Sequence, residues 1–276
     1  MRLVLPYDHV LTASRDSGDT VDAILSAVYA LGVRAVDISS DDAVREGREA
    51  LRDRLRATGL SVASYHAILD LTRPYSEVTL GHLAEEALFF GAESLTVMPG
   101  LVRNDVSREA AVAAMHTGIA ALVKTTAALG IMTLIPNIAH TLSPYAAPSE
   151  LLLLLRGEKS GARVAFHTGN MYAIGEDIVA AYRELMPVIG RIVLSDVALD
   201  ERSFGDAPLI TVGGKYYYQT PVGKGDLPVK TFLSALTESG YAGDLVLSLY
   251  LVDDVSKAIA ESIEALKSLV PDTFSA

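Results

Sequence analysis

Four of the six histidines in this chain fall where predicted strands end, and imidazole is the side chain that titrates nearest to neutral pH. They are His9, His66, His140 and His167. A neutral imidazole can serve as a general base, a general acid or a metal ligand, so the histidines alone do not select one chemistry. Their shared placement predicts a polar pocket at the strand ends.

Other polar residues follow the same predicted strand ends and complete a candidate site. We expect His167 or His66 to act as a base, with Asp196 or Lys224 as its partner. The residues expected to bind substrate are His9, Asn137, His140, Asn170, Tyr217 and Lys224. The tyrosines at 216–218 would cover a ligand, or else form a β-like patch or a subunit contact. Asp37 either points into the pocket or caps the helix that follows it together with Ser39 and Ser40, and we expect the cap.

Composition excludes several classes of function. The chain has no cysteine, so disulfides, thiolate metal sites and cysteine nucleophiles are absent. Its formal net charge of −11 disfavours nucleic acid as a partner. The apolar run at the start of the chain ends at Pro6, and the leucine run covers only 151–155. Both are too short to cross a bilayer. We therefore expect a cytoplasmic protein with no membrane partner. The leucine run is either core or the interface of a homo-oligomer.

The elements that position these residues show a repeated pattern, in which an amphipathic stretch ends at a glycine and a short apolar run follows. Gly32, Gly59, Gly91 and Gly130 are examples. A glycine just past a helix can adopt the left-handed conformation that closes the last turn, so each marks a helix end before a buried strand. Apolar residues spaced by three and four within 21–31 are typical of the helices between.

Eight strand–helix units at a spacing of about 30 residues, with no linker between them, predict a closed parallel (β/α)8 barrel, a TIM barrel, rather than an open sheet. An open doubly wound sheet usually carries a glycine-rich turn after its first strand, and residues 7–10 contain no glycine. We expect one domain over 1–276. The connection at 196–228 is unusually long, which is typical of a functional cover or of disorder.

Detailed motifs in the last third of the chain resemble one protein family. The sequence 221–228 reads PVGKGDLP, and Gly240-Tyr241-Ala242-Gly243 follows it before the last predicted strand. This arrangement resembles the sugar phosphate isomerase/epimerase superfamily of xylose isomerase-like barrels, which also includes endonuclease IV. His66 after strand three and 194–196 after strand seven are similar in position. The resemblance implies the same barrel and proton transfer next to a carbonyl in a carbohydrate-like substrate.

The resemblance also implies a divalent metal held by Glu, Asp, His and Glu at the ends of strands five to eight. The corresponding residues here are Pro136, His167, Val193 and Ser248. Neither family carboxylate has a counterpart, and serine is a poor ligand for a hard divalent ion. The sequence therefore predicts that the family's metal site has been lost and that no cofactor is required.

Three hypotheses follow. In the first, the protein is an isomerase or epimerase that binds a small polar, sugar-like ligand and transfers protons without a metal. In the second, a different site for a divalent metal such as Zn or Mn is rebuilt from His9, His66, His140 and His167. In the third, the chain is a non-catalytic ligand-binding or partner-binding subunit. Endonuclease activity is disfavoured because the chain is acidic and lacks most of the metal ligands that this activity requires.

Overall fold

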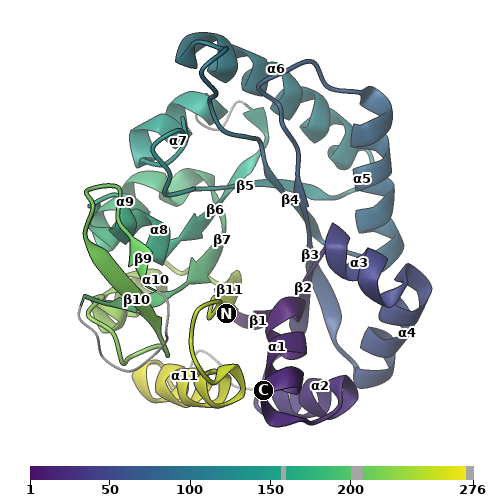
Figure 1. The fold of residues 1–276 in the computed structure, drawn as a ribbon, viewed down its shortest axis with the longest axis vertical. Helices are drawn as coiled ribbons and strands as arrows, with labels where there is room; N and C mark the ends of the chain where they lie inside the picture. The colour runs from purple at the N-terminus through teal and green to yellow at the C-terminus, as the bar shows by residue number, and fades with distance from the viewer. Residues whose placement is uncertain (157–159, 200–207, 272–276) are drawn as a thin grey trace.

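The computed structural model describes residues 1–156, 160–199 and 208–271, and it contains a closed barrel of eight parallel strands surrounded by helices (Figure 1). The strands follow one another around the barrel in sequence order, and the last pairs with the first. They are β1 (Arg2–Pro6), β2 (Ala35–Ser39), β3 (Ser61–Ile68), β4 (Ser94–Met98), β5 (Met132–Pro136), β6 (Arg163–His167), β7 (Ile189–Leu194) and β11 (Asp244–Leu247). The predicted (β/α)8 barrel is confirmed.

The helices form the outer layer, and several end at glycines as the sequence predicts. Gly59 and Gly91 have φ of 76° and 68°, the left-handed conformation that glycine adopts without steric cost. The helices are α1 (Tyr7–Ser17), α2 (Val21–Ala30), α3 (Ser40–Glu46), α4 (Arg48–Thr58), α5 (Glu77–Phe90), α6 (Arg108–Ala127), α7 (Pro148–Leu155), α8 (Thr168–Ala173), α9 (Ile178–Leu185), the short 3-10 helix η2 (Met186–Val188), α10 (Val229–Glu238) and α11 (Val255–Leu269).

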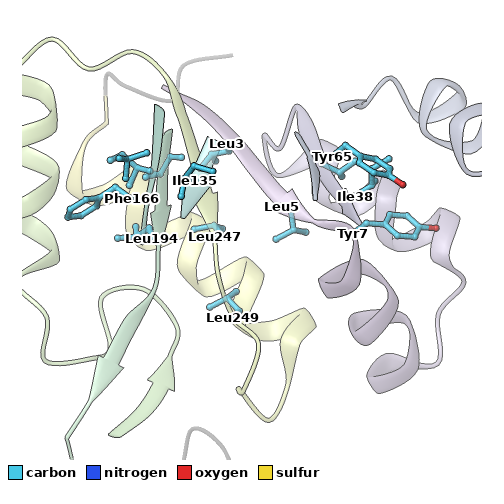
Figure 2. Close-up of a cluster of buried hydrophobic side chains, with 14 of the residues drawn as sticks. Leu3, Leu5, Tyr7, Ile38, Tyr65, Ile135, Phe166, Leu194, Leu247 and Leu249 are labelled. Atoms are coloured by element: carbon cyan, nitrogen blue, oxygen red, sulfur yellow. The ribbon is translucent and has the colours of Figure 1, made fainter. Parts of the chain in front are cut away.

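Two separate apolar regions hold the barrel together. The larger lies between the strands and the helices, where side chains such as Leu5 and Phe166 are fully buried (Figure 2). The smaller lies within the barrel and consists of Val4, Ala35, Ala63 and Val246, with Val193 packed against them. Alternate residues of each strand point to opposite faces, so β1, β2, β3, β7 and β11 contribute to both regions. Side chains that point into the barrel are also found at the carboxyl ends of the strands.

The long connection after β7 contains an antiparallel sheet of three strands rather than a simple loop (Figure 1). Its strands are β8 (Asp196–Ala198), β9 (Leu209–Ile210) and β10 (Tyr216–Thr220), with β10 in the middle. Residues 200–207 lie outside the described part of the chain. The sequence places Asp196 at the end of the seventh barrel strand, whereas β7 ends at Leu194 and Asp196 begins β8.

One described helix, α6, is long and apolar enough to cross a membrane by length and composition alone. In this fold α6 packs against α5, α7 and β5, and it buries Met115, Ile119 and Leu122. The core helix of a globular protein passes the same test. The apolar character of α6 is therefore accounted for by its place in the outer layer of the barrel.

Candidate functional site

A cavity of about 530 Å³ opens at the carboxyl ends of the barrel strands, and all eight strands contribute residues at or near their ends to its lining. This is the end at which barrels of this type build their active sites. The volume lies within the range of small-molecule sites. The cavity is the candidate functional site of the chain.

Three polar side chains from three strands lie next to one another at the cavity. His66 Nε2 lies 3.2 Å from Asp37 Oδ2, and Arg191 Nη2 donates to Asp37 Oδ1 over 2.9 Å. The side chains of Asp37 and Arg191 are only 5% and 2% exposed, whereas the ring of His66 is 38% exposed. The buried carboxylate thus joins a fully buried cation on one side to a ring that can reach a ligand on the other.

The charge state of Asp37 follows from these neighbours. Burial acts to raise the pKa of the Asp37 carboxyl, but Arg191 and then His66 outweigh it, so that this pKa lies below its usual range. Asp37 is therefore ionised at neutral pH. Arg191 Nη2 also lies 3.7 Å from Asp244 Oδ2, while Arg191 Nε and Nη1 have no hydrogen-bond partner among the described residues. Asp37 is thus the main counter-ion of this guanidinium.

His167 lines the same cavity but is held in a different state. Its Nδ1 accepts the backbone N–H of Asn170 at 3.2 Å, and its Nε2 lies 3.3 Å from Ser248 Oγ. Burial lowers the pKa of His167 to about 4, so the ring is neutral at pH 7. Because Nδ1 accepts, the proton lies on Nε2. His167 is therefore a hydrogen-bond donor towards Ser248 and the cavity, and its lone pair is already engaged.

The other two histidines lie outside the cavity lining. His9 is buried in α1, where Nε2 accepts the backbone N–H of Leu249 at 2.8 Å, and burial lowers its pKa to about 3. His140 is exposed, and its Nδ1 accepts the N–H of Leu142. The structure does not bring the four histidines together. In ranges 1–156, 160–199 and 208–271, no group of three or more His, Asp or Glu side chains could hold a metal ion.

The predicted asparagines support the site rather than form its centre. Asn137 is fully buried, and its side chain accepts the N–H of His167 and donates to the carbonyl of His167. Asn170 lines the cavity, and its Nδ2 donates to the carbonyl of Asn137 over 2.8 Å. Together they fix the end of β6, from which His167 projects.

Asp196, Tyr217 and Lys224 do not line the cavity. Asp196 is buried and accepts backbone N–H groups of Val197, Gly223, Gly225 and Leu227, so it organises the loop before α10. Tyr217 is buried against Tyr172, with ring centroids 6.1 Å apart, and Lys224 is exposed. The loop anchored by Asp196 explains why the sequence motif contains glycines: a Cβ at Gly225 would lie 2.2 Å from an Asp196 oxygen.

The interpretation of Asp37 as a helix cap is wrong. Ser39 caps α3, and its backbone N–H and hydroxyl donate to Asp42, which completes a capping box. Sequence reasoning also missed Arg191 as a site residue. The available signal was a lone charged residue within an apolar strand, because a buried arginine requires a partner.

The four residues expected in place of the family's metal ligands do converge. Pro136, His167, Val193 and Ser248 all line the cavity. Proline and valine side chains offer no donor atom, and His167 already uses Nδ1 to accept from the backbone. This donor set does not fit a divalent ion.

Solved structures with the same fold include enzymes of several kinds. The IolI protein, crystallised with a zinc atom, is 14% identical with a TM-score of 0.76 over 100% of both chains. An L-ribulose 3-epimerase is 16% identical with a TM-score of 0.75, covering 99% of this chain and 95% of the other. The probable 3-DHS dehydratase AsbF of Bacillus anthracis is 14% identical with a TM-score of 0.74, covering 97% and 99%.

These structural similarities show a shared fold. No curated protein sequence matches the chain significantly. The family model described as xylose isomerase-like TIM barrel matches residues 25–269, which is most of the chain. The protein is therefore a member of the xylose isomerase-like TIM barrel family.

Proposed function

We propose that this protein catalyses proton transfer at the carbon next to a carbonyl group, in a small hydroxy-carbonyl ligand and without a metal ion. The observation that carries the proposal is the contact between His66 and the buried, ionised Asp37 at the cavity. A carboxylate that orients an imidazole is a recurrent arrangement in general base catalysis. Arg191 holds Asp37 in place from within the barrel.

The arrangement assigns one nitrogen of His66 to each task. Nε2 is buried 3.2 Å from Asp37 Oδ2 without hydrogen-bond geometry in this structure, and a proton on Nε2 facing the carboxylate would leave the lone pair of Nδ1 to accept a proton. Nδ1 would remove hydrogen from the carbon, and the electrons of the C–H bond would move to the carbonyl oxygen to form an enolate. Delivery of a proton to the opposite face of that carbon by a second donor gives an epimer. Delivery of the proton to the neighbouring carbon, with transfer of the hydroxyl proton to the enolate oxygen, gives an isomer.

Donors on another part of the cavity wall suit the developing enolate oxygen. His167 is neutral and presents Nε2–H towards Ser248, whose hydroxyl can in turn donate to a ligand oxygen. A neutral imidazole donor stabilises an oxyanion without adding a labile charge. The names of the similar structures support a hydroxy-carbonyl ligand, because two are sugar 3-epimerases or epimerase-like proteins and one is a probable dehydratase.

Deuterium uptake from solvent tests this proposal. Ketoses, aldoses and the aryl hydroxyketone 2-hydroxyacetophenone are incubated with the protein in D2O and followed by NMR. We expect exchange next to the carbonyl in at least one compound, and a fall of about 100-fold or more in His66→Gln. The matched control is His82→Gln, an exposed histidine on α5, which should exchange like the wild type.

Two results would contradict the proposal. Exchange that persists in His66→Gln would assign the base elsewhere. Thermal stabilisation by a ligand with no exchange in any compound would favour the non-catalytic binding subunit.

A further inference from the structure

We infer that the ligand is amphipathic: a hydroxy-carbonyl compound whose other end is an aryl or alkyl group, rather than a sugar with hydroxyls on every side. This inference rests on the proposed function for the reacting end and adds the chemistry of the other end. It follows from the unequal distribution of polar and apolar side chains around the cavity.

One arc of the barrel, from β4 through β5, β6 and β7 to β11, presents six apolar side chains to the cavity, among the polar side chains of Thr96, His167, Asn170, Arg191 and Ser248. The six side chains, which form an apolar wall, are Met98, Pro136, Ile138, Ala165, Val193 and Val246. The wall includes Pro136 and Val193, which occupy positions where the family resemblance implied metal ligands. Apolar contact has thus replaced coordination along this arc.

Two polar side chains on this arc already have partners within the protein. Thr96 Oγ1 lies 2.7 Å from Ser64 Oγ, and Asn170 Nδ2 donates to the carbonyl of Asn137. The Ser248 hydroxyl, which contacts His167, is left for the oxygen of the reacting end. A hydroxyl of a bound sugar on this side would have to displace these pairs or remain without a partner, and an unpaired buried hydroxyl weakens binding.

The other arc of the barrel, from β1 to β3, carries the carboxylates, whereas the buried Arg191 belongs to β7. Asp8, Asp37, Asp41 and Asp42 line this side of the cavity together with His66. The hydroxy-carbonyl end of a ligand is expected here, next to the base. The opposite end then meets the apolar wall.

Two exposed apolar side chains also line the cavity, Ile68 at the end of β3 and Tyr250 after β11. They are 77% and 56% exposed. An apolar substituent long enough to reach them would cover them and remove apolar surface from water. A free ketohexose would gain little from either contact.

Binding of two probes tests the inference by isothermal titration calorimetry. We expect 2-hydroxyacetophenone to bind about 10-fold or more tightly than the ketohexose D-tagatose. Val193→Asn should weaken binding of the aryl ketone by about 10-fold and leave that of D-tagatose within about 2-fold. Val44→Asn is the matched control, because Val44 lies on α3, is 84% exposed and does not line the cavity.

A second variant keeps the test valid if Val193→Asn does not fold. Ile68→Ser changes an exposed residue of the cavity lining and should weaken binding of the aryl ketone by about 3-fold. Binding of D-tagatose as tightly as the aryl ketone, or of neither probe, overturns the inference. Equal losses for both probes in the variants would do the same.

The outcome for the ligand is separable from the outcome for the reaction. Selective binding of the aryl ketone without deuterium exchange supports the amphipathic ligand and contradicts proton transfer. Exchange in D-tagatose, with no preference for the aryl ketone, contradicts the amphipathic ligand and supports proton transfer.

Discussion

At the scale of single residues, Asp37 connects the interior of the barrel to the cavity. Its Oδ1 contacts the buried Arg191, and its Oδ2 lies next to His66 at the cavity. A buried guanidinium is tolerated only when a counter-ion and hydrogen bonds offset the loss of hydration. The same carboxylate therefore stabilises the fold and orients the proposed base.

Removal of the charge on Asp37 should destabilise the protein strongly. Asp37→Asn leaves Arg191 buried with the more distant Asp244 as its remaining counter-ion in the described part of the chain, so we expect a loss of about 3–5 kcal/mol in the free energy of unfolding. Urea denaturation followed by circular dichroism measures it. Asp253→Asn, at an exposed position, should change stability by less than about 0.5 kcal/mol. Addition of Arg191→Met to Asp37→Asn should restore part of the lost unfolding free energy. A small decrease in unfolding free energy for Asp37→Asn alone would contradict the role assigned to the pair.

At the scale of elements, Asp196, which the sequence suggests as a catalytic partner, holds the backbone between β8 and α10 in place. Asp196 accepts the N–H of Val197 and three backbone N–H groups of the turn 223–227, and so ties β8 to the segment before α10. It does not line the cavity. Its contribution is to the packing of the β7–α10 connection.

Loss of the Asp196 side chain should therefore affect stability rather than exchange. Asp196→Ala leaves buried N–H groups without their acceptor, and we expect a decrease of about 2–4 kcal/mol in unfolding free energy. Deuterium exchange per folded molecule should stay within about 3-fold of the wild type at a temperature where the variant is folded. A loss of exchange as large as that of His66→Gln would return Asp196 to the catalytic centre.

The histidine that joins α1 to the segment after β11 makes stability depend on pH. The pKa of His9 is about 3 in the folded state, against about 6.5 in an unfolded chain. The unfolded chain therefore takes up the proton first, and stability falls as the pH drops below about 6.5 towards 3. Between pH 6.5 and 5 this costs about 2 kcal/mol. His9→Gln should lose that part of the pH dependence, as measured by urea unfolding at both pH values, whereas His82→Gln should keep it. The same change in unfolding free energy with pH in both variants would contradict the buried neutral state of His9.

At the scale of the whole molecule, charge restricts the ligands that can approach. The chain carries a net charge of −11, and four aspartates line the cavity against one arginine that is already paired. Arg45 contacts Asp8 and Asp42, two of these aspartates. An anionic substituent on a ligand would meet an unfavourable potential here.

A phosphorylated ligand should thus be a poorer one than its free form. We expect D-tagatose 6-phosphate to give an exchange kcat/KM at least about 10-fold below that of D-tagatose at low salt. The difference should narrow at 0.5 M NaCl, because salt screens exposed charges. A preference for the phosphate ester would show that the carboxylates do not control selection.

The sequence predicts the barrel well because its signals are local. Apolar spacing within each helix and the glycines that end them recur in every unit, and His66 and His167 were placed at strand ends by the same logic. The site's central pair was not predictable in this way, since Asp37 and Arg191 are 154 residues apart and meet only across the closed barrel. His9 does not line the cavity because β1 ends at Pro6 and α1 begins at once, and its ring contacts Leu249 and Tyr250 after β11.

The most direct test of metal-independent proton transfer is deuterium exchange by protein whose metal content has been measured. The protein is dialysed against EDTA, its content of Zn, Mn, Co and Mg is determined by plasma mass spectrometry, and exchange in 2-hydroxyacetophenone is followed by NMR with and without each added ion. We predict the same exchange rate, within about 2-fold, in metal-free protein and with any ion. Exchange that is absent from metal-free protein and restored by one ion would contradict the account.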